Sequence, residues 1–188
     1  MRTHILLVPA LLLSLMLLAA GCGKKQNKQT VEEPATETAV DMSQYMPNLA
    51  IGAEVPDFEA PDALGQPVKL SDFRGKYVVL DFWATWCKDC RAEMPAMKEL
   101  YNTYGPRGVQ FLGVSFDTDF QSLLDYGVEN EIAWLQVCNK IKWKENPISA
   151  ACDIHWIPTM FLVDPEGKLA GICFHASDLG KMLAEVTD

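Results

Sequence analysis

The feature that most constrains this chain is an apolar run that ends at two closely spaced cysteines. Residues 77–83 are almost entirely apolar, and the sequence Trp86-Cys87-Lys88-Asp89-Cys90 follows after a short turn. A run of this length predicts a buried central strand, and the segment after it predicts a helix. Two thiols at positions i and i+3 of a first helical turn face the same side, so they can close a disulfide or open to a dithiol. The pattern therefore predicts a redox-active pair where a strand turns into a helix.

The position of Cys87 at a helix start also bears on its reactivity. Unpaired N–H groups and the positive end of the helix dipole favour a thiolate there and lower the pKa of the thiol. A structural disulfide or half of a zinc site is the other interpretation of such a pair. No second CxxC and no nearby pair of histidines completes a set of metal ligands. We therefore expect a redox site that uses neither a metal nor a cofactor.

The start of the chain predicts export from the cytoplasm. Its first four residues carry positive charge, residues 5–20 form an apolar stretch that is short for a membrane span, and small residues lead to Cys22. This order predicts a signal peptide over residues 1–21. The residues before Cys22 resemble a bacterial lipobox, although Ala19 stands where Leu is more usual. The resemblance implies cleavage before Cys22 and a lipid anchor on it, whereas an ordinary signal peptide would leave Cys22 incidental.

Export determines how the other cysteines are interpreted. We expect a lipid-anchored protein of the bacterial cell envelope whose domain faces the periplasm or the exterior, where thiols tend to oxidise. Cys138 and Cys152 could then form a second disulfide, or these two and Cys173 could be small buried apolar side chains. The net charge of −9 gives no indication of nucleic-acid binding.

The composition changes along the chain and predicts its domains. Residues 22–45 are polar and lack apolar periodicity, so we expect a flexible tether that carries the lipidated Cys22. A single folded domain is expected over residues 46–188.

Within this domain the sequence predicts an α/β fold. Its expected elements are a β-hairpin of residues 55–58 and 66–70, strands at 77–83, 109–115 and 134–138, helices at 87–104, 120–131 and 148–153, a hairpin of residues 159–163 and 168–174, and a closing helix at 177–186. Pro95 should kink the first helix, and Ser177 is the expected N-cap of the last. This order predicts a mixed central sheet flanked by helices, with an N-terminal β-hairpin extension.

Three segments resemble thioredoxin-like proteins. Residues 79–95 resemble their active-site segment, and Ile157-Pro158-Thr159 resembles their cis-proline loop. Residues 56–76 are similar to the TlpA/ResA-like extracytoplasmic branch, which overlaps with AhpC/TSA-type proteins. The resemblance covers residues 50–187 and implies a thioredoxin-like fold. It also implies a thiol-disulfide oxidoreductase that reduces protein disulfides, with cytochrome c maturation as one possible setting.

The resemblance also implies roles for individual residues. Cys87 would attack a substrate disulfide and Cys90, which is expected to be more buried, would resolve the mixed disulfide. Pro158 would present the backbone beside the dithiol to an extended substrate, with Ile157 and Trp86 contributing to substrate fit.

Two carboxyl groups are candidates for proton transfer. Asp81 stands at the position of the buried acid of thioredoxins, where many TlpA/ResA-like sequences have Asn; burial would raise its pKa and let it exchange a proton with Cys90. Glu93 resembles the acid of the branch's CxxCxxExP segment and could modulate the same thiols, or it could lie on a solvated helix face. Lys88 and Asp89 depart from the family pattern, which leaves the direction of electron flow open.

These interpretations imply particular partners and leave two alternatives. The expected partners are protein disulfides, a membrane thiol protein that donates electrons, and the membrane itself through the lipid. A peroxiredoxin-like peroxidase is the first alternative, but Thr85 and Asp81 do not match the Thr and Pro spacing of that chemistry. The second is a non-catalytic module that binds extended peptides beside Pro158.

Overall fold

The computed structural model of the chain describes residues 41–187. The predicted signal peptide, Cys22 and most of the predicted tether lie outside the described residues. The first described element is the 3-10 helix η1, Met42–Tyr45, which falls in the last residues of the segment predicted as a tether. No helix within this described range is long and apolar enough to cross a membrane.

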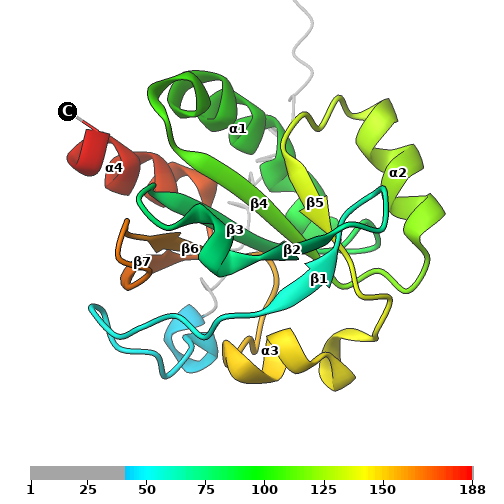
Figure 1. The fold of residues 1–188 in the computed structure, drawn as a ribbon, viewed down its shortest axis with the longest axis horizontal. Helices are drawn as coiled ribbons and strands as arrows, with labels where there is room; N and C mark the ends of the chain where they lie inside the picture. The colour runs from blue at the N-terminus through cyan, green and yellow to red at the C-terminus, as the bar shows by residue number, and fades with distance from the viewer. Residues whose placement is uncertain (1–40, 188) are drawn as a thin grey trace, which may run out of the picture. The chain divides into compact units, whose positions relative to one another are not determined.

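A mixed five-stranded sheet forms the centre of the domain (Figure 1). The central strand β3 pairs in parallel with β4, which pairs in parallel with β5, and β3 pairs antiparallel with β6, which pairs antiparallel with β7. The strands in spatial order are β5 Leu135–Val137, β4 Gln110–Ser115, β3 Val78–Trp83, β6 Thr159–Val163 and β7 Leu169–Cys173. This arrangement confirms the predicted mixed sheet.

Helices cover both faces of this sheet. In the view of Figure 1, α1 and α4 lie above the sheet and α3 lies below it. The α-helices are α1 Lys88–Tyr104, α2 Phe120–Glu129, α3 Pro147–Ala151 and α4 Ala176–Thr187, and the further 3-10 helices are η2 Leu70–Phe73, η3 Gly105–Arg107 and η4 Trp143–Glu145. Helix coverage on both sides explains why β3 is a continuous apolar run rather than an alternating one.

The two faces of β3 pack into different aromatic groups. All six residues of β3 are buried. On one face Phe82 packs against Phe116 and Phe161, with ring centroids 6.3 and 5.1 Å away. On the other face Trp83 packs 5.6 Å from Tyr126 of α2. Burying an aromatic side chain of this size stabilises a fold by about 2–3 kcal/mol, so β3 holds the segment that follows it in a fixed position.

Some predicted boundaries differ from the structure. The N-terminal hairpin is present, but its strands are β1 Glu59–Pro61 and β2 Pro67–Lys69, so the first strand begins later than predicted. α1 continues through Pro95. The prediction that Ser177 caps the last helix is wrong, because α4 already begins at Ala176. The backbone N–H of Ala176 donates instead to a carboxylate from α1, which the sequence around α4 does not reveal.

Candidate active site

Cys87 and Cys90 form a disulfide at the junction of β3 and α1. Their Cα atoms lie 5.3 Å apart. Cys87 is the N-cap residue of α1, and its sulfur accepts a hydrogen bond from the Cys90 N–H at 3.1 Å. Both are largely buried, with Cys87 7% exposed and Cys90 3% exposed. The sulfur of Cys87 therefore meets the amino end of the helix, where a thiolate is stabilised.

The segment before β6 meets the disulfide from the other side. The Ile157–Pro158 peptide bond is cis, as the sequence predicts. The carbonyl oxygen of Ile157 lies 3.6 Å from the Cys87 sulfur. Ile157 is buried, so its side chain leaves little surface for a substrate to contact.

A groove of about 310 Å³ lies beside Pro158. Its walls come from four parts of the chain: the helix η1, the start of α1, the segment before β6 and the segment after β7. The lining residues are Met42, Asp89, Glu93, Trp156, Pro158, Phe174 and His175. Tyr45 of η1 packs on Trp156, with ring centroids 4.9 Å apart. The groove borders Pro158 and Asp89, which lies between the two cysteines, so it has the place that an extended chain would need for the predicted role of Pro158.

Asp81 is a buried carboxyl group beneath the first turns of α1. It is 3% exposed and lies in the middle of β3, opposite Met160 of β6. Burial, and then the charge of Glu93, raises its pKa from 3.8 to about 7. Glu93 stands one turn after Cys90 on α1, so the two share a helix face, and the Glu93 charge is close enough to act on Asp81. A carboxyl group that is half ionised near neutral pH is suited to take up and return a proton.

Glu93 connects α1 to the start of α4. One carboxylate oxygen accepts the Ala176 N–H at 2.8 Å, and the other lies 3.0 Å from His175 Nδ1. The alternative of a solvated helix face is therefore wrong for Glu93, because its carboxylate contacts the first N–H group of another helix. A negative charge at a helix start is stabilising.

We expect Glu93→Gln to lower the pKa of Asp81, because the Glu93 charge is one of the two causes that raise it. Gln keeps an oxygen for the Ala176 N–H, so the free energy of unfolding should fall by only about 1 kcal/mol. NMR titration of the Asp81 carboxyl carbon checks the first effect and urea unfolding the second. Glu99→Gln, at an exposed site of the same helix, is the matched control. An unchanged Asp81 midpoint would refute the coupling.

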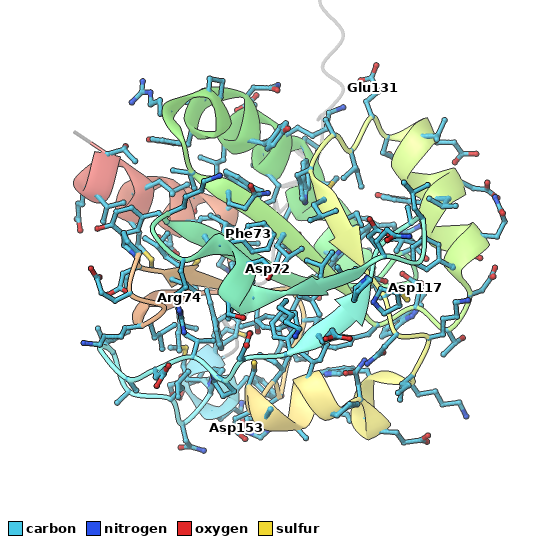
Figure 2. The ribbon with its side chains drawn as sticks, viewed as in Figure 1. Asp72, Phe73, Arg74, Asp117, Glu131 and Asp153 are labelled. Carbon is cyan, nitrogen blue, oxygen red and sulfur yellow. A yellow bond between two sulfur atoms is a disulfide. The ribbon has the colours of Figure 1, made fainter. Side chains whose placement is uncertain are left out.

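Asp117 is a functional residue that sequence reasoning missed. It lies in the loop between β4 and α2 (Figure 2) and is buried. Its carboxylate accepts hydrogen bonds from the Thr85 N–H at 3.0 Å, the Thr85 hydroxyl at 2.7 Å and the Ser115 hydroxyl at 2.7 Å. Thr85 stands in the turn two residues before Cys87, so Asp117 holds the turn that presents the nucleophile. The available signal was a polar residue just after β4, since the carboxyl ends of parallel strands meet at one edge of a sheet.

Replacing Asp117 by alanine should loosen this turn. Hydrogen bonds to a charged group contribute about 1.5–3 kcal/mol each and are not additive, so we expect a loss of about 2–4 kcal/mol in the free energy of unfolding. Asp117→Asn keeps one acceptor oxygen and should lose less than half of that. Asp125→Ala, at an exposed position of α2, should change little. Urea unfolding and hydrogen exchange of the Thr85 amide measure the effect, and full amide protection in Asp117→Ala would contradict it.

The remaining described cysteines form no further disulfide. Cys138, Cys152 and Cys173 are all buried and unpaired, so the hypothesis of a Cys138–Cys152 bond is wrong. The Cys138 thiol donates to the Asp117 carbonyl oxygen at 3.0 Å. Burial raises the pKa of Cys152 and of Cys173 to about 12, which keeps both as unreactive thiols near neutral pH. Within residues 41–187 no cluster of His, Cys, Asp or Glu side chains could hold a metal ion.

Comparison with known proteins agrees with this geometry. Residues 51–172 match the model of the AhpC/TSA family. The thiol-disulfide oxidoreductase ResA of Geobacillus kaustophilus is 36% identical over 124 residues, which cover 66% of this chain and 69% of that protein. The thioredoxin domain of a thiol-disulfide oxidoreductase from Bacteroides vulgatus superposes with a TM-score of 0.68 at 31% identity, over 74% of this chain and 99% of that one. A thiol:disulfide interchange protein from Bacteroides sp. gives 0.67 at 31% identity, over 74% and 91%.

The family match over residues 51–172 contains Asp81, the Cys87–Cys90 disulfide and Pro158. The thioredoxin-like fold predicted from the sequence is thereby confirmed, with the N-terminal hairpin as its extension. The chain therefore belongs to the AhpC/TSA family and, within the thioredoxin superfamily, to the TlpA/ResA-like thiol-disulfide oxidoreductases.

Proposed function

We propose that this enzyme works as a reductant of protein disulfides outside the cytoplasm. In the reduced enzyme the Cys87 thiolate attacks one sulfur of a substrate disulfide, and the other substrate sulfur leaves and takes a proton. The Cys90 thiol gives its proton to Asp81, and its thiolate attacks the Cys87 sulfur. The Cys87–Cys90 disulfide forms as the bond between Cys87 and the substrate breaks. The second substrate sulfur leaves as a thiolate and takes the proton that Asp81 received, so the substrate departs as a dithiol. Two electrons thus pass from the enzyme to the substrate.

The observation that carries this direction is the negative charge around the dithiol. Asp81 lies buried beneath α1, Asp89 lies between the two cysteines, and Glu93 lies one turn beyond Cys90. Carboxylates near a thiolate raise the free energy of the reduced form, whereas a strong oxidant needs a stabilised thiolate. The amino end of α1, Lys88 and Arg91 act in the opposite sense, but Lys88 and Arg91 are exposed, where water weakens the effect of their charges, whereas Asp81 is buried. The balance favours the disulfide form of the enzyme, which makes the dithiol a reductant.

The cellular setting belongs to the same proposal. The lipobox-like sequence before Cys22 supports a lipid anchor in the bacterial envelope, with the tether predicted over residues 22–45 as the spacer between the lipid and the domain. An enzyme that reduces disulfides there is itself oxidised in each cycle, so a membrane thiol protein must return two electrons to Cys87 and Cys90. The resemblance to the TlpA/ResA-like branch implies apocytochrome c as one substrate, whose haem-attachment CxxCH segment can form a similar disulfide.

One contact argues against peroxidase activity. That chemistry requires a threonine hydroxyl close to the attacking cysteine and able to bind peroxide, and Thr85 is the nearest candidate. Its hydroxyl donates instead to Asp117 at 2.7 Å. A non-catalytic peptide-binding module would use the groove beside Pro158 but would not need a carboxyl group with a pKa near 7 beneath the dithiol.

The test compares three reactions of the full-length protein after it has been reduced and freed of reductant. We expect rapid loss of disulfides from insulin and from an oxidised CxxCH peptide, with one enzyme disulfide formed per substrate disulfide opened. Hydrogen peroxide should be consumed no faster than by a free dithiol. Retained peptide binding without disulfide reduction would support the binding module, and rapid peroxide consumption that depends on Cys87 would support the peroxidase.

A further inference from the structure

A second surface adjoins the dithiol, and none of its residues line the groove beside Pro158. Trp86, which directly precedes Cys87, is 55% exposed. Its ring lies 6.5 Å from that of Trp143 in η4, and the Lys144 Nζ atom lies 4.0 Å from the centroid of the Trp143 ring. We call Trp86, Lys142, Trp143 and Lys144 the tryptophan-lysine face.

This face is basic although the protein as a whole is acidic. The chain carries a net charge of −9, yet residues 139–146 contain three lysines and one glutamate. Lys142 and Lys144 are exposed, and within residues 41–187 neither forms an ion pair. Lys140 contributes less, because it lies close enough to Asp119 to lower the pKa of that carboxyl group. The local positive charge therefore belongs chiefly to Lys142 and Lys144.

The opposite charge prevails in the groove. Asp89 and Glu93 both line it, so the active-site disulfide lies between an acidic groove and a basic aromatic face. Trp86 is exposed and the half-buried Trp143 supports it. Tryptophan flanked by cations is typical of protein interfaces, where the aromatic ring binds and the charges select the partner and speed association.

From this arrangement we infer that the enzyme selects protein substrates that carry an acidic segment beside their disulfide, and that this segment binds the tryptophan-lysine face. The inference rests on the proposed reductase function and specifies its substrate class. A membrane with anionic lipids would also attract tryptophan and lysine. Trp86, however, is the residue next to the attacking Cys87, so a bilayer on this face would cover the sulfur during catalysis. A protein segment that arrives with the disulfide fits this position better.

The test uses three disulfide peptides that differ only in the residues flanking one cysteine, which are acidic, neutral or basic. Reduced full-length enzyme is mixed with each in a stopped-flow instrument, and the second-order rate constant is measured at low salt and at 0.5 M NaCl. We expect the acidic peptide to react about tenfold faster than the basic one at low salt, with the ratio falling toward one at high salt because salt screens exposed charges.

Charge reversal provides the matched comparison. Lys142→Glu combined with Lys144→Glu should reverse the order of the acidic and basic peptides. Lys76→Glu combined with Lys168→Glu changes the same number of charges at the far ends of β3 and β7 and should keep the wild-type order. Equal rates for all three peptides with wild-type enzyme would overturn the inference but leave the reductase function intact.

Two further outcomes are distinguishable. No reduction of any peptide would overturn the proposed function itself. Sedimentation with phosphatidylglycerol vesicles that is lost in the Lys142/Lys144 variant, together with equal peptide rates, would assign the face to the membrane and overturn the inference. The salt dependence and the peptide order are measured on wild-type enzyme, so they decide the question even if the double variant folds poorly.

Discussion

Replacing Cys90 by alanine is expected to turn the enzyme into a trap for its substrates. Cys87 keeps its place at the N-cap of α1, so it can still attack a disulfide and form the mixed disulfide. The resolving thiol is absent in this variant, so the mixed disulfide persists until a thiol from solution attacks it. Because Cys90 is held next to Cys87, its loss should lengthen the lifetime of the mixed disulfide at least about 100-fold. Catalytic turnover should fall by a similar factor.

The measurement is expression of the full-length Cys90→Ala variant in its native envelope, followed by acid quenching and non-reducing electrophoresis. Partners should appear as adducts that reducing agent releases. Cys87→Ser is the matched control and should give none, while Cys152→Ser, at a buried thiol outside the site, should behave as wild type. Equal adduct formation by Cys87→Ser and Cys90→Ala would show that another cysteine carries the reaction.

Replacing Asp81 by asparagine should make the oxidised protein more stable at neutral and alkaline pH. The Asp81 pKa is about 7 in the folded protein and 3.8 without burial. Below pH 3.8 the group is protonated in both states, so it imposes no penalty. Between the two values the folded state holds a proton that the unfolded state has lost, and the free energy of unfolding therefore falls as pH rises. Above pH 7 the carboxyl group is ionised in both states, so the free energy of unfolding falls no further on its account.

The size of this effect follows from the difference between the two pKa values. Each pKa unit corresponds to about 1.4 kcal/mol, so the buried Asp81 carboxylate lowers the free energy of unfolding by up to about 4 kcal/mol at pH 8. Asn resembles the protonated acid in size and carries no charge. Urea unfolding of oxidised Asp81→Asn should therefore show a gain of this order at pH 8 and little change at pH 4. Asp125→Asn, at an exposed site, should show neither effect.

The same substitution should slow catalysis. Without Asp81 the Cys90 thiol has no buried acceptor for its proton, so resolution of the mixed disulfide should slow by about 10- to 100-fold near pH 7. Attack by Cys87 on the substrate should change much less, because the amino end of α1 stabilises that thiolate. If stable Asp81→Asn protein resolves mixed disulfides at the wild-type rate, Asp81 does not accept the Cys90 proton. The predicted effect of Asp81 on stability would be unaffected by that result.

The parts of the site that could be predicted from the sequence are those encoded locally. The apolar run of β3 and the spacing of Cys87 and Cys90 lie within one short segment, and periodicity is sufficient to place them. The resemblance to a family predicts Pro158 and Asp81 as site residues; the structure brings the carbonyl before Pro158 to the Cys87 sulfur and buries Asp81 in β3. Local patterns also located the helices and most strands to within a few residues.

The interactions that could not be predicted join residues far apart in the chain. Asp117 holds Thr85 across 32 positions, and Glu93 binds the Ala176 N–H across 83. Neither pair has a sequence signature of its own, because the contacts arise only when β4 lies beside β3 and α4 packs on α1. The same reason explains the error at Ser177: a cap from a distant carboxylate removes the need for a local capping side chain.

The reduction potential of the Cys87–Cys90 pair tests the central claim most directly. The full-length protein is equilibrated with defined ratios of reduced and oxidised glutathione, and the two thiols are counted by alkylation and mass spectrometry. The account predicts one two-electron couple at these cysteines, more reducing than about −200 mV, because carboxylates destabilise the thiolate form. A potential near that of DsbA, about −120 mV, would contradict it, since such a pair would oxidise its partners rather than reduce them.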